Sequence, residues 1–262
     1  MNLGLKGKVA AVTGARKGIG RAIALALASE GVDLAISSRD KEGLQKTADQ
    51  IAKQTGVRVV PIAGDLSKKQ DQESFIKQAA QAFQRIDILV NNAGSAHIGD
   101  LLSASDEAWE HHLNLKLLGY IRLTRAVIPW MQKQGGGVVL NIVGGYGKEP
   151  DGYAVVPGVI NAGLLNLTRA VASRHASEKI RVLSINPAVT QTDLMEEMAK
   201  QVAATMGITQ EKVKELMVRS SPMGRVGKPE DVASLVVFLA SDAASFMTGI
   251  SVSVDGGIAR GI

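Results

Sequence analysis

A glycine-rich segment at residues 13–20, Thr-Gly-Ala-Arg-Lys-Gly-Ile-Gly, joins an apolar strand to a helix rich in alanine and leucine. Its three glycines have the spacing of loops that let a backbone approach a nucleotide diphosphate. Gly14 permits the tight turn, Gly18 lets the main chain come close to the pyrophosphate, and Gly20 lets the helix press on the strand. The helix N-terminus then presents its amides to the anion. The segment predicts a dinucleotide-binding loop, with Arg16, Lys17 and Ile19 standing between the glycines.

The chain is long enough to bury one substantial core, because it has 262 residues of which 45% are hydrophobic. We expect a single domain over residues 1–262, since no linker, repeat or low-complexity tract interrupts it. The apolar runs are shorter than the roughly 20 residues of a membrane span, and no apolar segment precedes the first strand, which favours a soluble, cytoplasmic protein without a membrane partner. Cysteine is absent and no ligand set has metal-site spacing, so we expect neither thiolate chemistry nor a metal. The net charge of +5 is spread along the chain, which argues against nucleic acid as a partner.

Short β-branched runs alternate along the whole chain with longer segments of helical periodicity. This alternation predicts an α/β fold, a doubly wound (Rossmann) sheet of seven parallel strands with helices on both faces. Ligands gather in such folds at the carboxyl ends of the strands, near the point where strand order reverses. The expected strands are residues 9–13, 34–37, 57–62, 88–90, 138–143, 181–185 and 250–254. The expected helices are residues 18–30, 40–55, 68–84, 106–134, 157–176, 193–217 and 229–241.

The end of the second expected strand indicates which dinucleotide is bound. A chain that prefers NAD would offer a carboxylate there to the adenosine ribose hydroxyls. This chain has Ser38 followed by Arg39. The Arg39 guanidinium, together with Lys17 of the glycine loop, could hold a 2′-phosphate that a carboxylate would repel. NADP(H) is therefore favoured over the alternative that both cations are solvated surface charges.

Several short motifs resemble the short-chain dehydrogenase/reductase family over essentially the whole chain. They are the glycine loop, Asp-Leu at 65–66, Asn-Asn-Ala-Gly at 91–94 and Asn-Pro at 186–187. The resemblance also extends to the C-terminal part of the chain, including members that reduce 3-oxoacyl thioesters, and it implies a homo-oligomer, a tetramer or dimer. It further implies that Asp65 and Leu66 bracket the adenine, that Asn92, Ala93 and Gly94 line the ribose and the sheet centre, that Thr192 meets the nicotinamide amide, and that Pro187 belongs to the site.

The catalytic positions depart from the family pattern. Reducing a carbonyl creates an alkoxide, which needs a hydrogen-bond donor and an acid. The family resemblance implies Ser, Tyr and Lys for this work, but alignment puts Gly144, Pro157 and Asn161 at those three places. A positioned acid contributes about 10²–10⁴ in rate, so the ordinary mechanism cannot be assumed. Of the family's four catalytic residues only Asn114 is expected to remain, although a structural role in mid-helix is its alternative.

Replacement groups are available in the glycine-rich loop at residues 144–153. Tyr153 is the first candidate for the missing acid, with Lys148 as its charge partner, and Tyr146 is the second. The alternative is that each tyrosine packs its ring on the surface with its hydroxyl in water. Asn161 either hydrogen-bonds a nicotinamide ribose hydroxyl or is a satisfied helix residue. We expect His97 to face substrate, whereas His111, His112 and His175 have the pattern of ordinary helix-surface residues.

Residues 192–219 resemble the family's substrate lid, which implies a substrate that is apolar or carries an extended chain. Methionines and leucines of this segment could give an adaptable apolar surface, although such a stripe is more often packing. The leading hypothesis is an NADP(H)-dependent oxidoreductase for a carbonyl/alcohol or quinone-like substrate, with a non-standard proton donor. The alternative is a catalytically silent NADP(H)-binding sensor or partner subunit, and lyase or dehalogenase chemistry is a weaker third. The apolar side chains of the lid are Leu194, Met195, Met198, Val202, Met206 and Met217.

Overall fold

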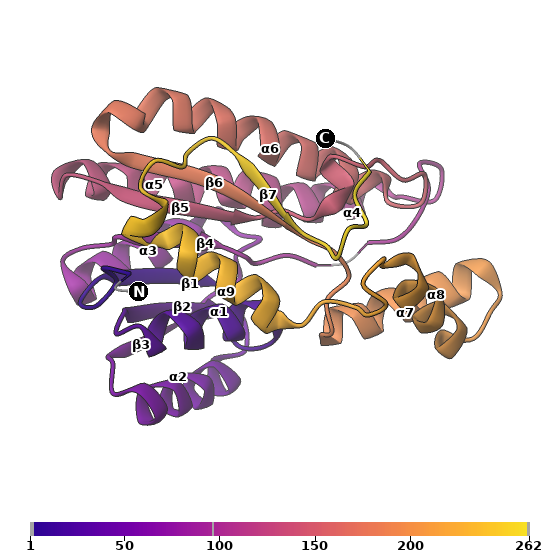
Figure 1. Ribbon diagram of the computed structural model, residues 1–262, viewed down its shortest axis with the longest axis horizontal. Helices are drawn as coiled ribbons and strands as arrows, with labels where there is room; N and C mark the ends of the chain where they lie inside the picture. Colours follow the sequence, from indigo (N-terminus) through magenta and orange to yellow (C-terminus); the bar gives the residue numbers. More distant parts are fainter. Residues whose placement is uncertain (1–2, 96, 261–262) are drawn as a thin grey trace.

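The computed structural model describes residues 3–95 and 97–260. Within them, seven parallel strands form one sheet in the order β3-β2-β1-β4-β5-β6-β7, so the predicted α/β fold is confirmed (Figure 1). The central strand β1 is buried along its whole length, as expected for a strand covered on both faces. The strands are β1 (Val9–Thr13), β2 (Asp33–Ser38), β3 (Val59–Ala63), β4 (Ile88–Asn91), β5 (Gly137–Ile142), β6 (Ile180–Pro187) and β7 (Ser251–Val254).

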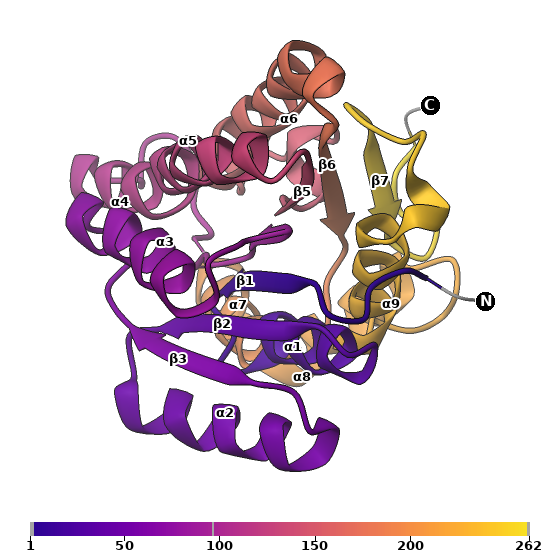
Figure 2. The ribbon, with the colours of Figure 1, turned by 90° about the vertical axis from the view of Figure 1, so that its left-hand side faces the viewer.

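Helices cover both faces of the sheet (Figure 2). Side chains alternate along each strand, so Ala10 and Val12 of β1 join one apolar cluster while Ala11 joins the other. The first cluster is completed by α1 (Gly18–Ser29), α2 (Lys41–Thr55) and α9 (Pro229–Ala240). The second is completed by α3 (Lys69–Phe83), α5 (Leu118–Lys133) and α6 (Val155–His175).

The strand order reverses between β1 and β4. The chain builds β1, β2 and β3 outward in one direction, then returns to the other side of β1 to build β4 through β7. Register pairs Val12 with Val90, so the loops that follow β1 and β4 leave the sheet side by side. Doubly wound folds bind ligands at this point.

Two expected helices differ from the structure. The segment expected as one helix over 106–134 is α4 (Asp106–His112), a π-helical turn at Leu113–Leu117, and α5; the Leu118 amide donates to the Leu113 carbonyl. A π-turn inserts one residue into an otherwise regular helix, which periodicity does not reveal, and such turns are frequent at functional sites.

The segment expected as one helix over 193–217 is two helices, α7 (Asp193–Met206) and α8 (Gln210–Ser220). Gly207 ends α7 in the left-handed region at φ 65°, and the Thr209 side chain caps α8. The pair has its own small apolar cluster and projects from the sheet in Figure 1.

Among the residues that the structure describes, one helix has the length and apolar composition of a membrane span. Residues 155–178, which include α6, contain a window of mean hydropathy 1.3, although polar residues interrupt its apolar runs. The buried face of α6, with Ile160, Leu164 and Ala172, packs in the apolar clusters of the fold. Length and composition alone therefore do not separate this packed helix from a span.

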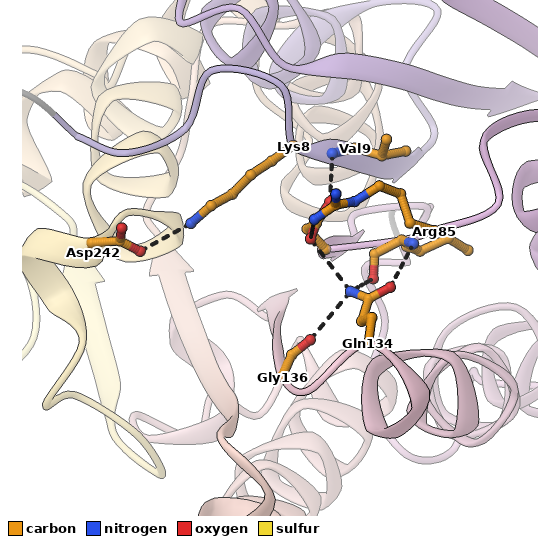
Figure 3. A network of polar contacts seen from close by, with 8 residues as sticks. Lys8, Val9, Arg85, Gln134, Gly136 and Asp242 are labelled. Carbon is orange, nitrogen blue, oxygen red and sulfur yellow. Dashed lines mark hydrogen bonds and ion pairs between the residues drawn. The ribbon is translucent and has the colours of Figure 1, made fainter.

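A polar network joins the opposite, amino ends of β1, β4 and β5 (Figure 3). The Asp87 carboxylate accepts from the Val9 amide at 2.8 Å and from the Arg85 guanidinium at 2.7 and 2.9 Å. The Gln134 side chain accepts from the Ile86 amide at 3.2 Å and donates to the Ile86 carbonyl at 2.9 Å. The strand starts are thus fixed at the end away from the site described next.

Candidate active site

A cavity of about 390 Å³ opens at the carboxyl ends of the central strands, where the strand order reverses. We call it the switch-point cavity. It brings together most of the predicted cofactor residues, which come from loops after β1, β2, β3, β4 and β6. The predicted residues that line it are Gly14, Arg16, Lys17, Gly18, Ile19, Gly20, Arg39, Asp65, Leu66, Asn92, Ala93, Gly94 and Thr192.

The glycine loop is shaped as a cradle for an anion. Gly14 and Gly18 adopt φ values of 66° and 56°, which side chains disfavour. A Cβ on Gly20 would overlap the Gly14 carbonyl, so only glycine lets α1 approach the strand. In the described part of the chain, the amides of Gly18, Ile19 and Gly20 at the start of α1 have no recorded acceptor, and the first turn of α1 has no acidic residue. These amides fit the pyrophosphate of a dinucleotide.

Asn92 and Thr13 join the glycine loop to the end of β4. The Asn92 amide group donates to the Thr13 carbonyl at 3.0 Å. The Thr13 hydroxyl in turn accepts from the backbone amides of Asn92 and Ala93, at 2.8 and 3.0 Å. This pair holds the two sides of the cavity in fixed register.

Three cations line the cavity, and they differ in how they are paired. Arg16 lies 3.5 Å from the Asp40 carboxylate, and Lys17 lies 2.5 Å from the Asp193 carboxylate. The exposed Arg39 guanidinium makes no hydrogen bond or ion pair with the described residues. All the donors of Arg39 are therefore available to a ligand phosphate, whereas Arg16 and Lys17 each share their donors with a carboxylate.

Asp65 is held ionised at the cavity wall. Burial alone would raise the pKa of its carboxyl, but hydrogen bonds from the Ser67 amide and hydroxyl, together with the charges of Arg39 and Lys68, lower the pKa below its ordinary value. A fixed acceptor beside Leu66 suits the polar edge and the face of a base.

Lys116 lies beside this cavity in the π-turn, and sequence reasoning did not select it. Its Nζ donates to the Val143 carbonyl at 2.6 Å and to Asn161 Oδ1 at 2.9 Å. Burial of the ammonium lowers its pKa to about 8. The Asn161 Nδ2 group meanwhile lies 3.5 Å from the Gly144 carbonyl, so Asn161 bridges the lysine and the loop after β5.

Three histidines gather next to Lys116. His111 is exposed on α4, as expected, whereas His112 is partly buried and is therefore not the ordinary surface residue that was expected. The His112 ring lies 5.3 Å from the rings of both His97 and His111, and His112 Nδ1 lies 3.1 Å from the Ser95 hydroxyl. Burial, and then the charges of His111, His97 and Lys116, lower the pKa of His112 to about 4. His111 lines the switch-point cavity.

Other predicted site residues lie outside the lining of this cavity. The Tyr153 ring is 60% exposed, and its expected partner Lys148 donates instead to the Ser251 carbonyl at 3.3 Å. Asn114 Nδ2 donates to the Glu110 carbonyl of its own helix at 2.9 Å. Pro187 ends β6. Their roles stay predictions.

Tyr146 and the lid residues also have defined places. Tyr146 lies in a short 3-10 turn, where burial and then the charge of Asp151 raise the pKa of its phenol. In the expected lid, Leu194 lines the cavity, whereas Val202 and Met217 pack between α7 and α8. The described residues hold no group of three His, Cys, Asp or Glu side chains arranged for a metal ion.

The signal that could have identified Lys116 is local. It is the one charged residue in the run Leu-Asn-Leu-Lys-Leu-Leu at 113–118. A regular helix puts positions 114 and 116 on opposite faces, so a site role for Asn114 did not imply one for Lys116.

Comparisons with known proteins agree with this arrangement. The profile of the family described as enoyl-(acyl carrier protein) reductase matches residues 14–259. The 3-oxoacyl-[acyl-carrier-protein] reductase FabG of Thermotoga maritima is 33% identical, covering 97% of this chain and 98% of that protein. The NADPH-dependent reductase BacG of Bacillus subtilis is 31% identical, covering 97% of this chain and 99% of that protein.

A solved structure is similar over the full length. The L-sorbose reductase of Gluconobacter frateurii, in complex with NADPH and L-sorbose, superposes with a TM-score of 0.94 at 30% identity, with 100% of both chains covered. The fold, the glycine loop at the strand-order reversal and these full-length matches lead to one conclusion. The chain belongs to the short-chain dehydrogenase/reductase family.

Proposed function

We propose that this chain is an NADP(H)-dependent oxidoreductase that interconverts a carbonyl and an alcohol, or reduces a quinone-like acceptor. The switch-point cavity is the observation that carries this proposal. It combines the amides of Gly18, Ile19 and Gly20, which have no recorded acceptor, with the Arg39 guanidinium, which makes no hydrogen bond or ion pair with the described residues. Amides suit the pyrophosphate, and Arg39 with Lys17 suits a 2′-phosphate. The NADPH named for the reductases of Bacillus subtilis and Gluconobacter frateurii supports the same cofactor.

When bound, NADP(H) supplies or accepts the hydride. This chain's residues have to position the two reactants and manage the proton. Our alignment puts Gly144, Pro157 and Asn161 at the family's Ser, Tyr and Lys places, and none of the three supplies a titratable proton. We therefore propose that the proton donor is non-standard.

We propose that residues 192–219, with α7 and α8, act as a substrate lid. The ion pair between Lys17 and Asp193 links α7 to the glycine loop, and Leu194 adds an exposed apolar side chain at the cavity. An apolar or chain-bearing substrate fits this surface.

Exposed Val159 on α6 is consistent with a homo-oligomer, a dimer or tetramer, which light scattering would measure.

The test follows NADPH oxidation with a panel of ketones, 3-oxoacyl thioesters and quinones. Steady turnover of one compound, with NADPH preferred over NADH, is the expected result. Tyr153→Phe is measured alongside: a loss above tenfold in kcat assigns the proton donor to Tyr153, and an unchanged kcat removes it from the mechanism.

The second candidate function is a catalytically silent NADP(H)-binding sensor or partner subunit. The exposure of Tyr153 favours it, because the first candidate for a replacement acid lies largely in solvent. Tight NADPH binding without turnover of any compound in the panel would support this second function.

A further inference from the structure

Lys116 lies beside the switch-point cavity, although it is not among the residues that line the cavity. Its aliphatic chain runs past Gly94, which lines the cavity: a Cβ on Gly94 would be 3.8 Å from Lys116 Cδ. Beyond that point Nζ reaches the Val143 carbonyl, at the end of β5, and Asn161 on α6. The π-turn, β5 and α6 therefore converge on one cation.

This cation is held but not neutralised. Both acceptors, the Val143 carbonyl and Asn161 Oδ1, are uncharged, and no carboxylate among the described residues forms an ion pair with Lys116. An enclosed charge without a counter-ion is costly to fold. An ammonium also has three N–H bonds, of which these contacts use two. One N–H and a full positive charge therefore have no recorded partner among the described residues.

We propose that Lys116 is the non-standard proton donor, giving its remaining N–H to the oxygen of the substrate carbonyl during reduction. This inference rests on the oxidoreductase function proposed above. Asn161 and the Val143 carbonyl act as positioning groups, because they fix Nζ without taking its charge. A preorganised cation in an enclosed site also stabilises negative charge developing on that oxygen.

The step balances as follows. The carbonyl carbon gains a hydride, with its two electrons, from the reduced nicotinamide cofactor, and the carbon–oxygen π bond becomes the lone pair of an alkoxide. One N–H bond of Lys116 breaks and an O–H bond forms, which gives the alcohol and a neutral amine. The amine then takes a proton from water. Alcohol oxidation runs the same transfers in reverse, with the neutral amine as base.

The environment of Lys116 suits this cycle. Burial lowers its pKa to about 8, so the group can give up and regain a proton near neutral pH. The titratable groups nearby are His97, His111 and His112 on one side, Tyr120 on α5 and Tyr146 on the loop after β5. His112, with a pKa of about 4, is uncharged there, and burial raises the pKa values of both phenols. None of these groups adds a negative charge near pH 8.

Two variants of Lys116 separate the effect of its positive charge from its ability to give up a proton. Lys116→Met removes the proton donor and keeps the length of the side chain. Lys116→Arg keeps a cation that stays protonated across the accessible pH range. Lys133→Met on α5 is the matched control, because Lys133 is exposed and distant from the cavity lining. NADPH binding by fluorescence checks that each variant retains its fold.

Kinetics give the first readout. In the wild type we expect kcat for carbonyl reduction to fall as pH rises through about 8, since the protonated form is the acid, and kcat for alcohol oxidation to rise. Lys116→Met should lower kcat by about 10²-fold or more with little change in the Kd for NADPH. Lys116→Arg should lack the alkaline fall. Full kcat in Lys116→Met, or an effect confined to the Kd for NADPH, would overturn the inference and leave the oxidoreductase function standing.

A second readout needs no turnover. In protein labelled with ¹³C-lysine, one Cε resonance should titrate near pH 8 and be absent from Lys116→Arg. Lys116 titrating at its ordinary value of 10.5 would contradict the proposal. A wild type that binds NADPH but turns over no substrate would overturn the proposed function itself, and the donor role of Lys116 with it.

Discussion

Arg39 is the residue on which cofactor choice is expected to depend. Lys17 and Arg16 each lie beside a carboxylate, whereas Arg39 makes no hydrogen bond or ion pair with the described residues. A guanidinium bound to a phosphate forms charge-assisted, often bidentate hydrogen bonds. The discrimination between NADPH and NADH should therefore be concentrated at one side chain.

Arg39→Ala should raise the Kd for NADPH by about 10- to 100-fold, because each charged hydrogen bond contributes about 1.5–3 kcal/mol. The Kd for NADH should change little. Fluorescence titration with both cofactors measures the two values, and Lys46→Ala, an exposed residue of α2, is the control. Equal weakening of both cofactors would show that Arg39 does not contact the 2′-phosphate.

His112 makes the stability of the fold sensitive to acid. Its folded pKa of about 4 lies below its ordinary value of 6.5, so the unfolded chain binds a proton that the folded site does not take up. The free energy of unfolding should fall as pH falls from about 6.5 to about 4. Urea unfolding across this pH range should show that the free energy of unfolding falls less steeply with pH in His112→Gln than in the wild type or in His111→Gln. Identical slopes in all three proteins would refute this assignment.

Several residues that line the switch-point cavity could be predicted from sequence because they follow a strand directly. Once β1, β2, β3 and β4 are located, their carboxyl ends meet, and Gly14, Arg39, Asp65 and Asn92 come together. Lys116 could not be found in this way. It reaches the site through a long side chain from a π-turn, and its contacts with Val143 and Asn161 depend on how α5 and α6 pack.

At the scale of elements, α7 is joined to the glycine loop by one exposed ion pair. Hydrogen bonding and the charge of Lys17 lower the pKa of the Asp193 carboxyl, so it is ionised at neutral pH. An exposed pair contributes little to stability. The larger effect of the pair is on the cavity. Asp193 binds the Lys17 ammonium, which a phosphate could otherwise bind, and it adds a negative charge at the rim of the cavity.

Asp193→Asn should therefore bind NADPH about two- to fivefold more tightly at low salt, and the gain should shrink at high salt. Glu196→Gln, on the same helix but paired with Lys214 of α8, is the control. Calorimetry at two ionic strengths measures both. Weaker binding by Asp193→Asn would mean that the ion pair organises the site instead of competing with the ligand.

The elements themselves were largely predictable, with errors of a known physical kind. Every expected strand is present: β1 has the expected ends, and the other six strands have ends that differ from those expected. The two helix predictions that differ from the structure lie where backbone geometry, and not the apolar pattern, decides where a helix ends or changes its hydrogen bonding. Gly207 divides α7 from α8 through a left-handed φ, and the turn at Leu113–Leu117 keeps the helical direction while adding a residue.

At the scale of the whole molecule, the two ends of the sheet carry different kinds of polar group. The carboxyl ends carry the switch-point cavity, and the amino ends carry the network around Asp87. Asp87→Ala should lower the free energy of unfolding by about 1–3 kcal/mol, because it leaves the Val9 amide and the Arg85 guanidinium without their acceptor.

Urea denaturation measures this loss. Lys8→Ala is the control, since the ion pair of Lys8 with the exposed Asp242 side chain should contribute about 1 kcal/mol or less. NADPH affinity should be unchanged in folded Asp87→Ala. A stability equal to that of the wild type would contradict the structural role of the network.

The central claim is that this chain reduces a carbonyl with a hydride from NADPH, although our alignment puts Gly144, Pro157 and Asn161 at the family's donor positions. The most direct measurement uses NADPH carrying deuterium at the transferable position of C4, with the best carbonyl compound of the panel and excess protein. The account predicts that mass spectrometry finds the deuterium on the carbinol carbon of the product. Bound, unconsumed NADPH with no labelled alcohol from any compound would contradict it.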